Sequence, residues 1–290
     1  MVQRKFLEKI VKTRKSIAKK TGLKIPIPER IRKFAYSKIS IPESIVIMGN
    51  KIFLAEKSIV SAGLALNGIW EETETELVKK LIKKNDLVVD IGANIGYFSL
   101  IFAKLVGPGG KVFSFEPELE NLNLLKKNIE VNGYKNVIIE NTAISDSDGK
   151  TKLYLSKNDR GHHRISQSEK QNKNAVTVTK ITLDQYFEKK TDSKKISFIK
   201  IDVEGSEIGV LKGMTSILQG NNNLKLLVEY CPNHILDYGA KPEEFVQILK
   251  TNGFNIYQIN PERKILEPVS EKILLNIPAK SCINLICKKD

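Results

Sequence analysis

The sequence has few cysteines, and their positions match no disulfide framework or metal-binding motif. Cys231, Cys282 and Cys287 are an odd number without metal-ligand spacing. This pattern argues against a small fold held together by disulfides and favours reduced thiols in an intracellular protein. We expect the three cysteines to be buried structural residues.

Long hydrophobic runs are also missing. No apolar run in the 290 residues approaches the roughly 18 residues that cross a bilayer, and the first residues lack the apolar region of a secretory signal. We therefore expect a cytoplasmic protein. A hydrophobic content of 41% is enough for one sizeable core, most simply an α/β domain behind an amino-terminal extension.

Positive charge is concentrated at the amino terminus. Residues 1–33 hold twelve Lys or Arg against Glu8 and Glu29, a net +10 by subtraction, so only +4 of the total +14 is left for the rest of the chain. Three interpretations stay open for this basic arm. It lies as an amphipathic helix on an anionic membrane, contacts nucleic acid, or is simply solvated.

Alternating patterns of apolar residues divide the remainder of the chain. We predict a basic, helical extension over 1–40, strands and a helix packed on the core over 41–85, and the main domain over 86–290. Alternating strands and helices imply a parallel sheet; they are predicted at 86–91, 96–105, 111–115, 119–132 and 136–140. Segments 254–260 and 282–288 are expected to pair as a closing antiparallel hairpin, and 145–175 is expected to be a mobile loop with a strand at 150–156.

A glycine turn follows the first strand of the main domain. Gly92 and Gly96 are four apart and Asp90 precedes them, which fits neither the G-x-G-x-x-G dinucleotide fingerprint nor the Walker loop. A carboxylate directly before the turn disfavours a phosphate and favours a ligand with an amine or a cationic centre. Glu116, at the tip of the next strand, can accept hydrogen bonds from both hydroxyls of a ribose. S-adenosylmethionine combines these groups and is the predicted cofactor.

Five segments, taken in order, carry a family resemblance. They are Asp-Ile-Gly-Ala-Asn-Ile-Gly-Tyr-Phe-Ser-Leu at 90–100, Phe-Glu-Pro at 115–117, Asn-Ile-Glu-Val-Asn at 128–132, Ala-Ile-Ser-Asp at 143–146 and Ile-Asp-Val-Glu-Gly-Ser-Glu at 201–207. The chain resembles FkbM-type methyltransferases over roughly residues 40–290, and the Asp-Val-Glu-Gly element distinguishes it best from methyltransferases in general.

The resemblance implies an α/β, Rossmann-like fold with a mostly parallel seven-stranded sheet. It also implies O-methylation of a hydroxyl on a sugar, a glycoconjugate or another small molecule. Carried over by position, the cofactor-binding residues are Asp90, Gly92, Ala93, Asn94 and Gly96 at the methionine end, Glu116 at the ribose, and Asn141 with Ala143 at the adenine edge.

Candidates for the catalytic base are two carboxylates and two histidines. Asp202 and Glu204 are two apart on a predicted strand, so both side chains are expected to leave the same face at its carboxyl end, with Glu229 on the neighbouring strand. His162 and His163 fall in the predicted loop above the pocket, and imidazole titrates near neutral pH. A divalent metal on the carboxylates is considered but not predicted.

Two other functions remain as alternatives. A nucleic-acid methyltransferase would use the basic arm on phosphates, although the main domain is only weakly basic. A non-catalytic, membrane-associated binding module with the same fold is the other alternative, because a fold alone does not establish activity. We expect a small-molecule or glycan acceptor, with peripheral membrane contact through the arm as a secondary hypothesis.

Overall fold

The protein is represented by a computed structural model that describes residues 41–156, 159–161, 163–165, 174–188 and 195–289. The basic extension predicted over 1–40 and the candidate base His162 lie outside the described residues. The predictions made for them stay predictions.

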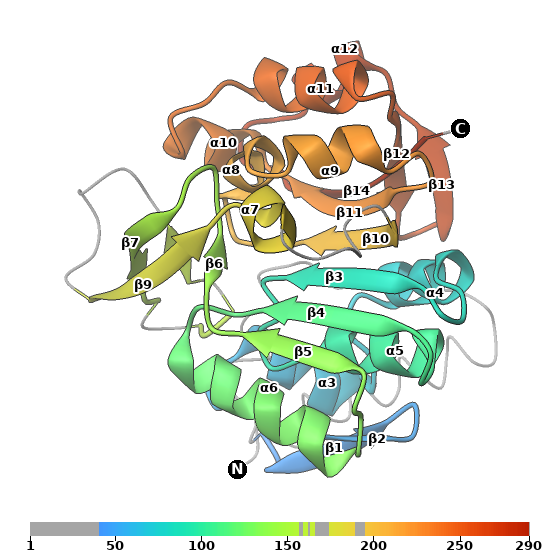
Figure 1. The fold of residues 1–290 in the computed structure, drawn as a ribbon, viewed down its shortest axis with the longest axis vertical. Coiled ribbons are helices and arrows are strands. Elements are labelled where there is room, and N and C mark those ends of the chain that lie inside the picture. The colour runs from blue at the N-terminus through green and yellow to red at the C-terminus, as the bar shows by residue number, and fades with distance from the viewer. Residues whose placement is uncertain (1–40, 157–158, 162, 166–173, 189–194, 290) are drawn as a thin grey trace, which may run out of the picture.

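A sheet of eight strands forms the centre of the fold (Figure 1). In spatial order its strands are β13 (Ile265–Pro268), β12 (Asn255–Asn260), β14 (Ile283–Lys288), β11 (Lys225–Tyr230), β10 (Ile196–Ile201), β3 (Leu87–Ile91), β4 (Lys111–Phe115) and β5 (Val137–Glu140). The five strands from β11 to β5 are parallel, whereas β14 runs antiparallel to both β11 and β12. The predicted pairing of 254–260 with 282–288 is therefore present. The large sheet has one strand more than the seven expected, because β13 extends its edge.

The order of the strands creates a crevice at one end of the sheet. From β3 the chain moves outward to β4 and β5, and it then returns to the other side of β3 with β10 and β11. Such a reversal leaves a gap between the two sets of connections at the carboxyl ends of the strands, where ligands bind in open α/β sheets. The predicted site residues at the ends of β3, β4 and β10 are brought to this crevice.

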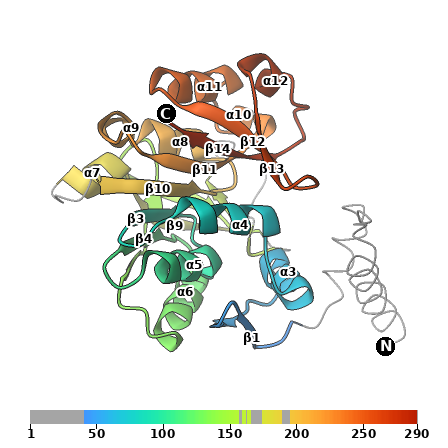
Figure 2. The same ribbon diagram turned by 90° about the vertical axis from the view of Figure 1, so that its right-hand side faces the viewer.

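Helices cover both faces of the sheet, and Figures 1 and 2 show α11 and α12 at one end of the molecule and α6 with β1 at the other. One face carries α3 (Ile59–Asn67), α4 (Glu72–Leu81), α5 (Tyr97–Val106) and α6 (Leu119–Val131), beside the hairpin of β1 (Ser44–Ile47) and β2 (Asn50–Phe53). The other face carries α7 (Leu183–Glu188), α8 (Glu207–Lys212), α9 (Thr215–Gly220), α10 (Pro232–Asp237), α11 (Pro242–Thr251) and α12 (Glu271–Leu275).

Two hydrophobic cores result, one on each face. Within β3, Val89 and Ile91 contribute to the core beneath α7 to α12, while Val88 contributes to the core beneath α3 to α6. Every residue of β3 is buried. A parallel strand covered on both faces needs a continuous apolar run of this kind, which explains why the sequence around Leu87 predicts it so clearly.

A second sheet projects from the side of the large one (Figure 1). Its strands are β6 (Ala143–Ile144), β9 (Ala175–Ile181), β7 (Gly149–Tyr154) and β8 (Arg164–Ile165), in that spatial order. The strand predicted at 150–156 is thus present as β7. It pairs along its whole length with β9, so the described parts of 145–175 contain regular strands where a mobile loop was expected.

Two local features interrupt the simple alternation of strands and helices. Residues 207–220 form two short helices, α8 and α9, which are divided at Gly213, where a Cβ atom would lie 1.9 Å from the backbone oxygen of Ser145. The expected strands around Gly49 are present, but the segment that follows them folds as α3. Its amino end is capped by Ser58, whose side chain accepts a hydrogen bond from the Ser61 N–H.

The cysteines also differ from expectation. Cys231 and Cys282, which were expected to be reduced, form a disulfide across 51 residues of sequence, and Cys287 is a buried free thiol. The partners follow the last pair of the β11–β14 ladder, Tyr230 with Ile283. Antiparallel pairing brings them together, and sequence spacing cannot reveal it. None of the helices in the part of the chain that the structure describes has the length and apolar character needed to span a bilayer.

Candidate active site

Two adjoining hollows open at the carboxyl ends of β3, β4 and β10. The smaller one has an apolar wall that includes Phe115, Ile144 and Leu153. The larger one is a cleft of about 730 Å³. They share five lining residues, which are Gly92, Asn94, Gly161, Asp202 and Glu204. The two hollows therefore form one site with an apolar end and an acidic end.

Asp90 lies fully buried at the floor of the cleft. Its Oδ2 accepts a hydrogen bond of 2.6 Å from the Ser99 hydroxyl, which in turn contacts the Ser114 hydroxyl at 2.9 Å. Its Oδ1 has no hydrogen-bond partner among the residues that the structure describes. Burial raises the pKa of Asp90, and the charge of Lys200 and the Ser99 hydroxyl lower it in part. An acceptor of this kind suits an amino group of a ligand in the cleft.

Close contacts with other parts of the protein require glycine at both ends of the turn. A Cβ atom at Gly92 would lie 1.9 Å from the backbone oxygen of Asp202, and one at Gly96 would lie 2.5 Å from Leu125 Cδ1. Both glycines have positive φ angles, as does Asn94 between them. The space beside these two glycines is occupied by Asp202 and Leu125, while Gly92 also lines both hollows, so their predicted contact with the cofactor stays a prediction. Ala93 is buried behind the turn and lines the larger cleft.

Glu116 sits where the ribose was predicted and already holds the turn. Its Oε2 accepts the Asn94 N–H at 2.8 Å and its Oε1 accepts the Glu118 N–H at 2.9 Å. Burial raises the pKa of Glu116 to about 7, against the lowering effect of these two donors. Each carboxylate oxygen has a further lone pair, so Glu116 retains the capacity to accept hydroxyl groups from the hollow that it lines.

Of the two residues predicted at the adenine edge, Ala143 lines the smaller hollow and Asn141 does not. Ala143 and its neighbour Thr142 line the smaller hollow. Asn141 is exposed and does not line either hollow; its Nδ2 donates to the backbone oxygens of Glu116 and Pro117, each at 3.0 Å. Asn141 therefore braces the carboxyl end of β4, and its assignment to the cofactor stays a prediction.

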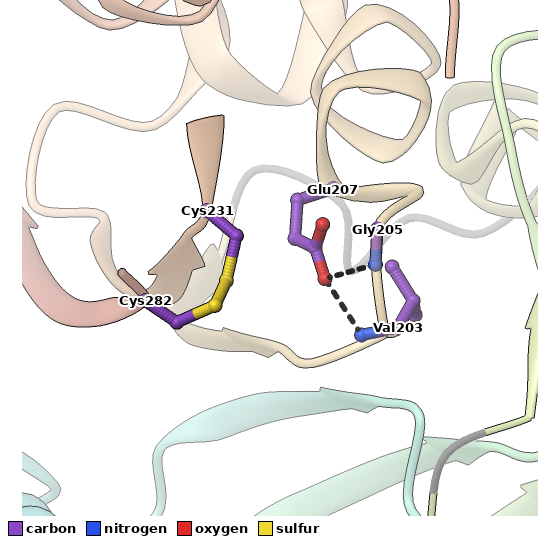
Figure 3. Close-up of a disulfide and its surroundings, with 5 residues drawn as sticks. All are labelled: Val203, Gly205, Glu207, Cys231 and Cys282. Carbon is purple, nitrogen blue, oxygen red and sulfur yellow. Dashed lines mark hydrogen bonds between the residues drawn. A yellow bond between two sulfur atoms is a disulfide. The ribbon is translucent and has the colours of Figure 1, made fainter. Parts of the chain in front are cut away.

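Asp202 and Glu204 both reach the cleft, but they leave a turn and not a strand, because β10 ends at Ile201. Glu204 has φ 53°, a left-handed conformation that is unusual for a residue with a side chain. The turn is held by Glu207, whose Oε1 accepts the N–H groups of Val203 and Gly205, each at 3.1 Å (Figure 3). The two side chains lie in the same cleft, as predicted, but a turn brings them there and not the alternation of side chains along a strand.

Carboxylates dominate the larger cleft. Burial and the charges of Asp202 and Glu229 raise the pKa of Glu204 well above its ordinary value. Burial and Asp202 likewise raise the pKa of Glu71 to about 8 and that of Glu229 to about 9. Mutual repulsion among these buried carboxylates therefore makes it unfavourable for all of them to be ionised at the same time. A ligand that brings a positive charge into the cleft would stabilise their ionised forms.

One buried cation offsets part of this negative charge. Lys200 donates to Asp202 at 2.8 Å, and its side chain is only 5% exposed. Burial alone would lower the pKa of Lys200, but the carboxylates of Asp202, Asp90 and Glu71 raise it overall. The ammonium group also lies 5.0 Å from the centre of the Phe98 ring.

Sequence reasoning missed Glu71 and Lys200. Glu71 lines the cleft and has φ 43°, so three residues with side chains in left-handed conformations, Glu71, Asn94 and Glu204, surround the same hollow. Backbone strain of this kind gathers at functional sites. The feature of the sequence that could have identified Lys200 is a charged residue inside the mostly apolar strand β10.

His163 is in the smaller hollow, which Asp202 and Glu204 also line, and it does not line the larger cleft. Its Nδ1 accepts the Ser156 N–H at 3.0 Å. In the neutral ring, Nε2 then carries the proton and acts as a donor. This arrangement favours a carboxylate over His163 as the base. The other candidate, His162, lies beyond the described ranges.

The sequence is similar to a known protein family and to individual methyltransferases. The family model described as "Methyltransferase FkbM domain" matches residues 90–281. Hexuronic acid methyltransferase AglP of Haloferax volcanii is 29% identical over 153 residues, which cover 52% of this chain and 59% of that protein. Methyltransferase sdnD of Sordaria araneosa is 28% identical over 161 residues, covering 46% of this chain and 62% of that protein. The chain thus spans about three fifths of the length of these relatives.

A solved structure carries the same family name. Methyltransferase FkbM from Methylobacillus flagellatus KT is 16% identical, and the match covers 80% of this chain and 56% of that chain with a TM-score of 0.41. The likeness is too distant to assign any individual residue.

Proposed function

Since the chain belongs to the FkbM methyltransferase family, we propose that it is an S-adenosylmethionine-dependent methyltransferase that methylates a hydroxyl group of a sugar or glycoconjugate. The observation that carries the proposal is the carboxylate-lined cleft that adjoins the smaller hollow. Carboxylates are strong acceptors for the hydroxyl groups of a polyol. The relative AglP is described as a hexuronic acid methyltransferase, which supports a sugar acceptor.

Residues of the two adjoining hollows fit the cofactor, with Asp90 in the larger cleft and Glu116 and Phe115 in the smaller hollow. Asp90 Oδ1 would accept a hydrogen bond from the amino group of the cofactor, Glu116 would accept its ribose hydroxyls, and the apolar wall near Phe115 would take the adenine. When bound, S-adenosylmethionine supplies a methyl group on a positively charged sulfur, and the thioether that remains leaves without needing a proton.

Proton removal from the acceptor falls to the chain. An alcohol is a weak acid, so its proton must pass to a base as the oxygen attacks. Glu204 is our candidate, since it faces the cleft and its raised pKa makes it a stronger base than an ordinary carboxylate. Asp202, held in place by Lys200, would position the acceptor by hydrogen bonding. Glu71 is placed to accept another hydroxyl of the same molecule.

The acidic cleft argues against a nucleic-acid acceptor, because carboxylates repel phosphates. A membrane role of the basic arm is a separate proposal, and it is tested by vesicle flotation with and without residues 1–33. Equal flotation of the two proteins would end it.

Purified protein offered S-adenosylmethionine tests the proposal against a panel of acceptors. The panel contains glycosides of hexuronic acids, matched neutral hexose glycosides and an RNA oligonucleotide. We expect a glycoside to gain one methyl group that resists mild alkali, as an ether does and a methyl ester does not. Methylation of the RNA alone, or an alkali-labile product, would contradict the proposed acceptor. Calorimetric titration with S-adenosylmethionine separately checks the cofactor.

A further inference from the structure

Four side chains with metal-binding atoms gather at one wall of the larger cleft. They are Glu229, Cys231, His234 and Cys282, and their ligand atoms all lie within 4.8 Å of one another. Glu229 belongs to β11, Cys231 caps α10, His234 lies within α10, and Cys282 directly precedes β14. Three separate elements thus contribute to one cluster, and three of its members line the cleft: Glu229, His234 and Cys282.

The register of two strands and the position of one helix bring these residues to the same place. The β11–β14 ladder ends at Tyr230 and Ile283, so the next residues on each strand, Cys231 and Cys282, face one another with their Cα atoms 4.4 Å apart. His234 follows Cys231 by three residues, the spacing that places two side chains on the same face of a helix. The cluster is therefore a consequence of strand register and helix position.

The chemistry of the cluster points to zinc. Two sulfurs, one imidazole nitrogen and one carboxylate oxygen form a mixed set of four ligands, and such sets hold Zn²⁺ in a tetrahedron at about 2.0 to 2.3 Å. In a tetrahedron with these bond lengths the ligand atoms lie about 3.3 to 3.8 Å apart. Ligand atoms that are now up to 4.8 Å apart would therefore have to approach by about 1 Å through side-chain rotation, and the two sulfurs would have to move apart once their bond is reduced. In the disulfide form the sulfurs are bonded to one another and are not thiolate ligands (Figure 3).

We propose that the reduced protein binds one zinc ion through Glu229, Cys231, His234 and Cys282, and that the disulfide is the metal-free, oxidised form of the same site. A dithiol reductant supplies two electrons and two protons, which convert the disulfide into two thiols, and the reductant becomes a cyclic disulfide. Zn²⁺ then displaces the two thiol protons as two zinc–sulfur bonds form.

The site would be structural. Four protein ligands fill the tetrahedron and leave no position for a reacting water or alcohol. The ion would link the end of β11 and the start of α10 to the segment before β14, the same connection that the disulfide makes. Either state holds this wall of the cleft, and the inference goes beyond the methyl transfer proposed above.

Metal titration of the full-length protein tests the proposal. Protein is reduced with a dithiol, stripped with a chelator, freed of both reagents without air, and titrated with Co²⁺ and then with Zn²⁺. We expect the absorption of a tetrahedral cobalt–thiolate centre to appear, its replacement by one equivalent of zinc, and one zinc per chain by mass spectrometry of the metal. Oxidised protein should bind neither ion at this site.

Three variants separate a zinc site from a disulfide alone. His234→Ala retains both cysteines and so retains the disulfide, but it should weaken zinc binding by about 10-fold or more. Cys282→Ser, at an exposed position, should lose both the disulfide and the cobalt–thiolate absorption. Cys287→Ala is the matched control, because Cys287 is buried outside the cluster, and it should bind zinc as the unaltered protein does.

The opposite results are equally clear. Reduced protein that binds less than one zinc per chain, or His234→Ala protein that binds zinc with unchanged affinity, overturns the proposal and leaves a disulfide only. Circular dichroism of each variant shows whether it is folded. Formation of the Cys231–Cys282 disulfide in oxidised His234→Ala protein shows that the two cysteines are still adjacent.

Discussion

The ammonium group of Lys200 lies 2.8 Å from the carboxylate of Asp202, with the lysine side chain 5% exposed and the aspartate side chain 36% exposed. Burial alone would lower the pKa of Lys200, but the charges of Asp202, Asp90 and Glu71 raise it. A single buried cation therefore stabilises three carboxylates, which are Asp202, Asp90 and Glu71.

Replacing Lys200 by Met should destabilise the fold. Removal of one partner from a buried ion pair typically costs about 3 to 5 kcal/mol, and the partial exposure of Asp202 argues for the lower end. Urea denaturation measures the change. Lys212→Met is the control, because Lys212 pairs with Glu244 at 2.9 Å on the surface, where both side chains are 40% exposed and such pairs contribute at most about 1 kcal/mol. Equal costs for the two variants would show that the buried lysine is not holding the acids.

Gly92→Ala should disrupt the glycine turn. The added Cβ would lie 1.9 Å from the Asp202 backbone oxygen, so β3 and β10 must separate locally. Gly133→Ala is a matched control with φ 70° and nothing within 4 Å of its Cβ, so it should show only the cost of the left-handed conformation, about 1 kcal/mol. Thermal unfolding compares the two. A loss at Gly92 no larger than that at Gly133 would contradict the crowding.

Glu116→Gln should weaken S-adenosylmethionine binding. The amide turns an NH₂ group toward one of two backbone N–H donors, those of Asn94 and Glu118, and it also removes an acceptor from the ribose site. Loss of a hydrogen bond to a charged group costs about 1.5 to 3 kcal/mol, or roughly 10- to 150-fold in affinity. Isothermal titration measures it. Glu130→Gln, on the exposed side of α6, should bind as the unaltered protein does.

Activity should rise with pH through the titration of Glu204. Its pKa is raised, so the neutral form persists to higher pH than for an ordinary carboxyl, and only the ionised form can accept a proton. Glu204→Gln should lower kcat by about 100- to 10,000-fold, remove the rising limb, and leave cofactor affinity intact. Glu56→Gln, at an exposed position, provides the control. A rising limb that survives in Glu204→Gln would assign the base elsewhere.

Stability of the ligand-free protein should fall as pH rises from about 5 to about 8, because of Glu71. Its pKa is about 8 in the folded state, against an ordinary value of 4.5 for a glutamate in the unfolded chain, so the folded state binds more protons across this range. When the folded state holds more protons, the free energy of unfolding decreases with increasing pH. Denaturation at a series of pH values should give a shallower decline for Glu71→Gln. An unchanged slope would show that Glu71 does not titrate in this way.

The sequence predicted those parts of the fold that depend on local patterns. Three local features are recognisable in the sequence: the apolar run of β3, the turn at Gly92 and Glu116 at the end of β4. Each can be recognised because burial on both faces, a positive φ angle or a strand end favours particular residue types at that position. The parallel order follows from alternating strands and helices. The resemblance to FkbM-type methyltransferases, carried by short motifs in order, is confirmed by the family match over 90–281.

Features that depend on distant contacts were not predictable. The break at Gly213 depends on a backbone oxygen of Ser145, and the disulfide depends on the register of β11 with β14. Glu71 faces the cleft because of a left-handed residue before α4, which no pattern of neighbouring residues required. Pairs that form across 50 or more residues leave no periodic signal along the chain.

Asp159 joins segment 159–161, which contributes Asp159 and Gly161 to the lining of the larger cleft, to a distant part of the sequence. Its Oδ1 accepts the Ile59 N–H at 3.1 Å and the Gly161 N–H at 2.9 Å, while the Arg160 N–H donates to the Lys57 oxygen at 3.0 Å. Segment 159–161 is therefore anchored to residues that precede the large sheet, whose earliest strand in the chain, β3, begins at Leu87. A shortened chain that began at residue 86 would keep every strand of that sheet and lose the hydrogen bonds that hold this part of the cleft wall.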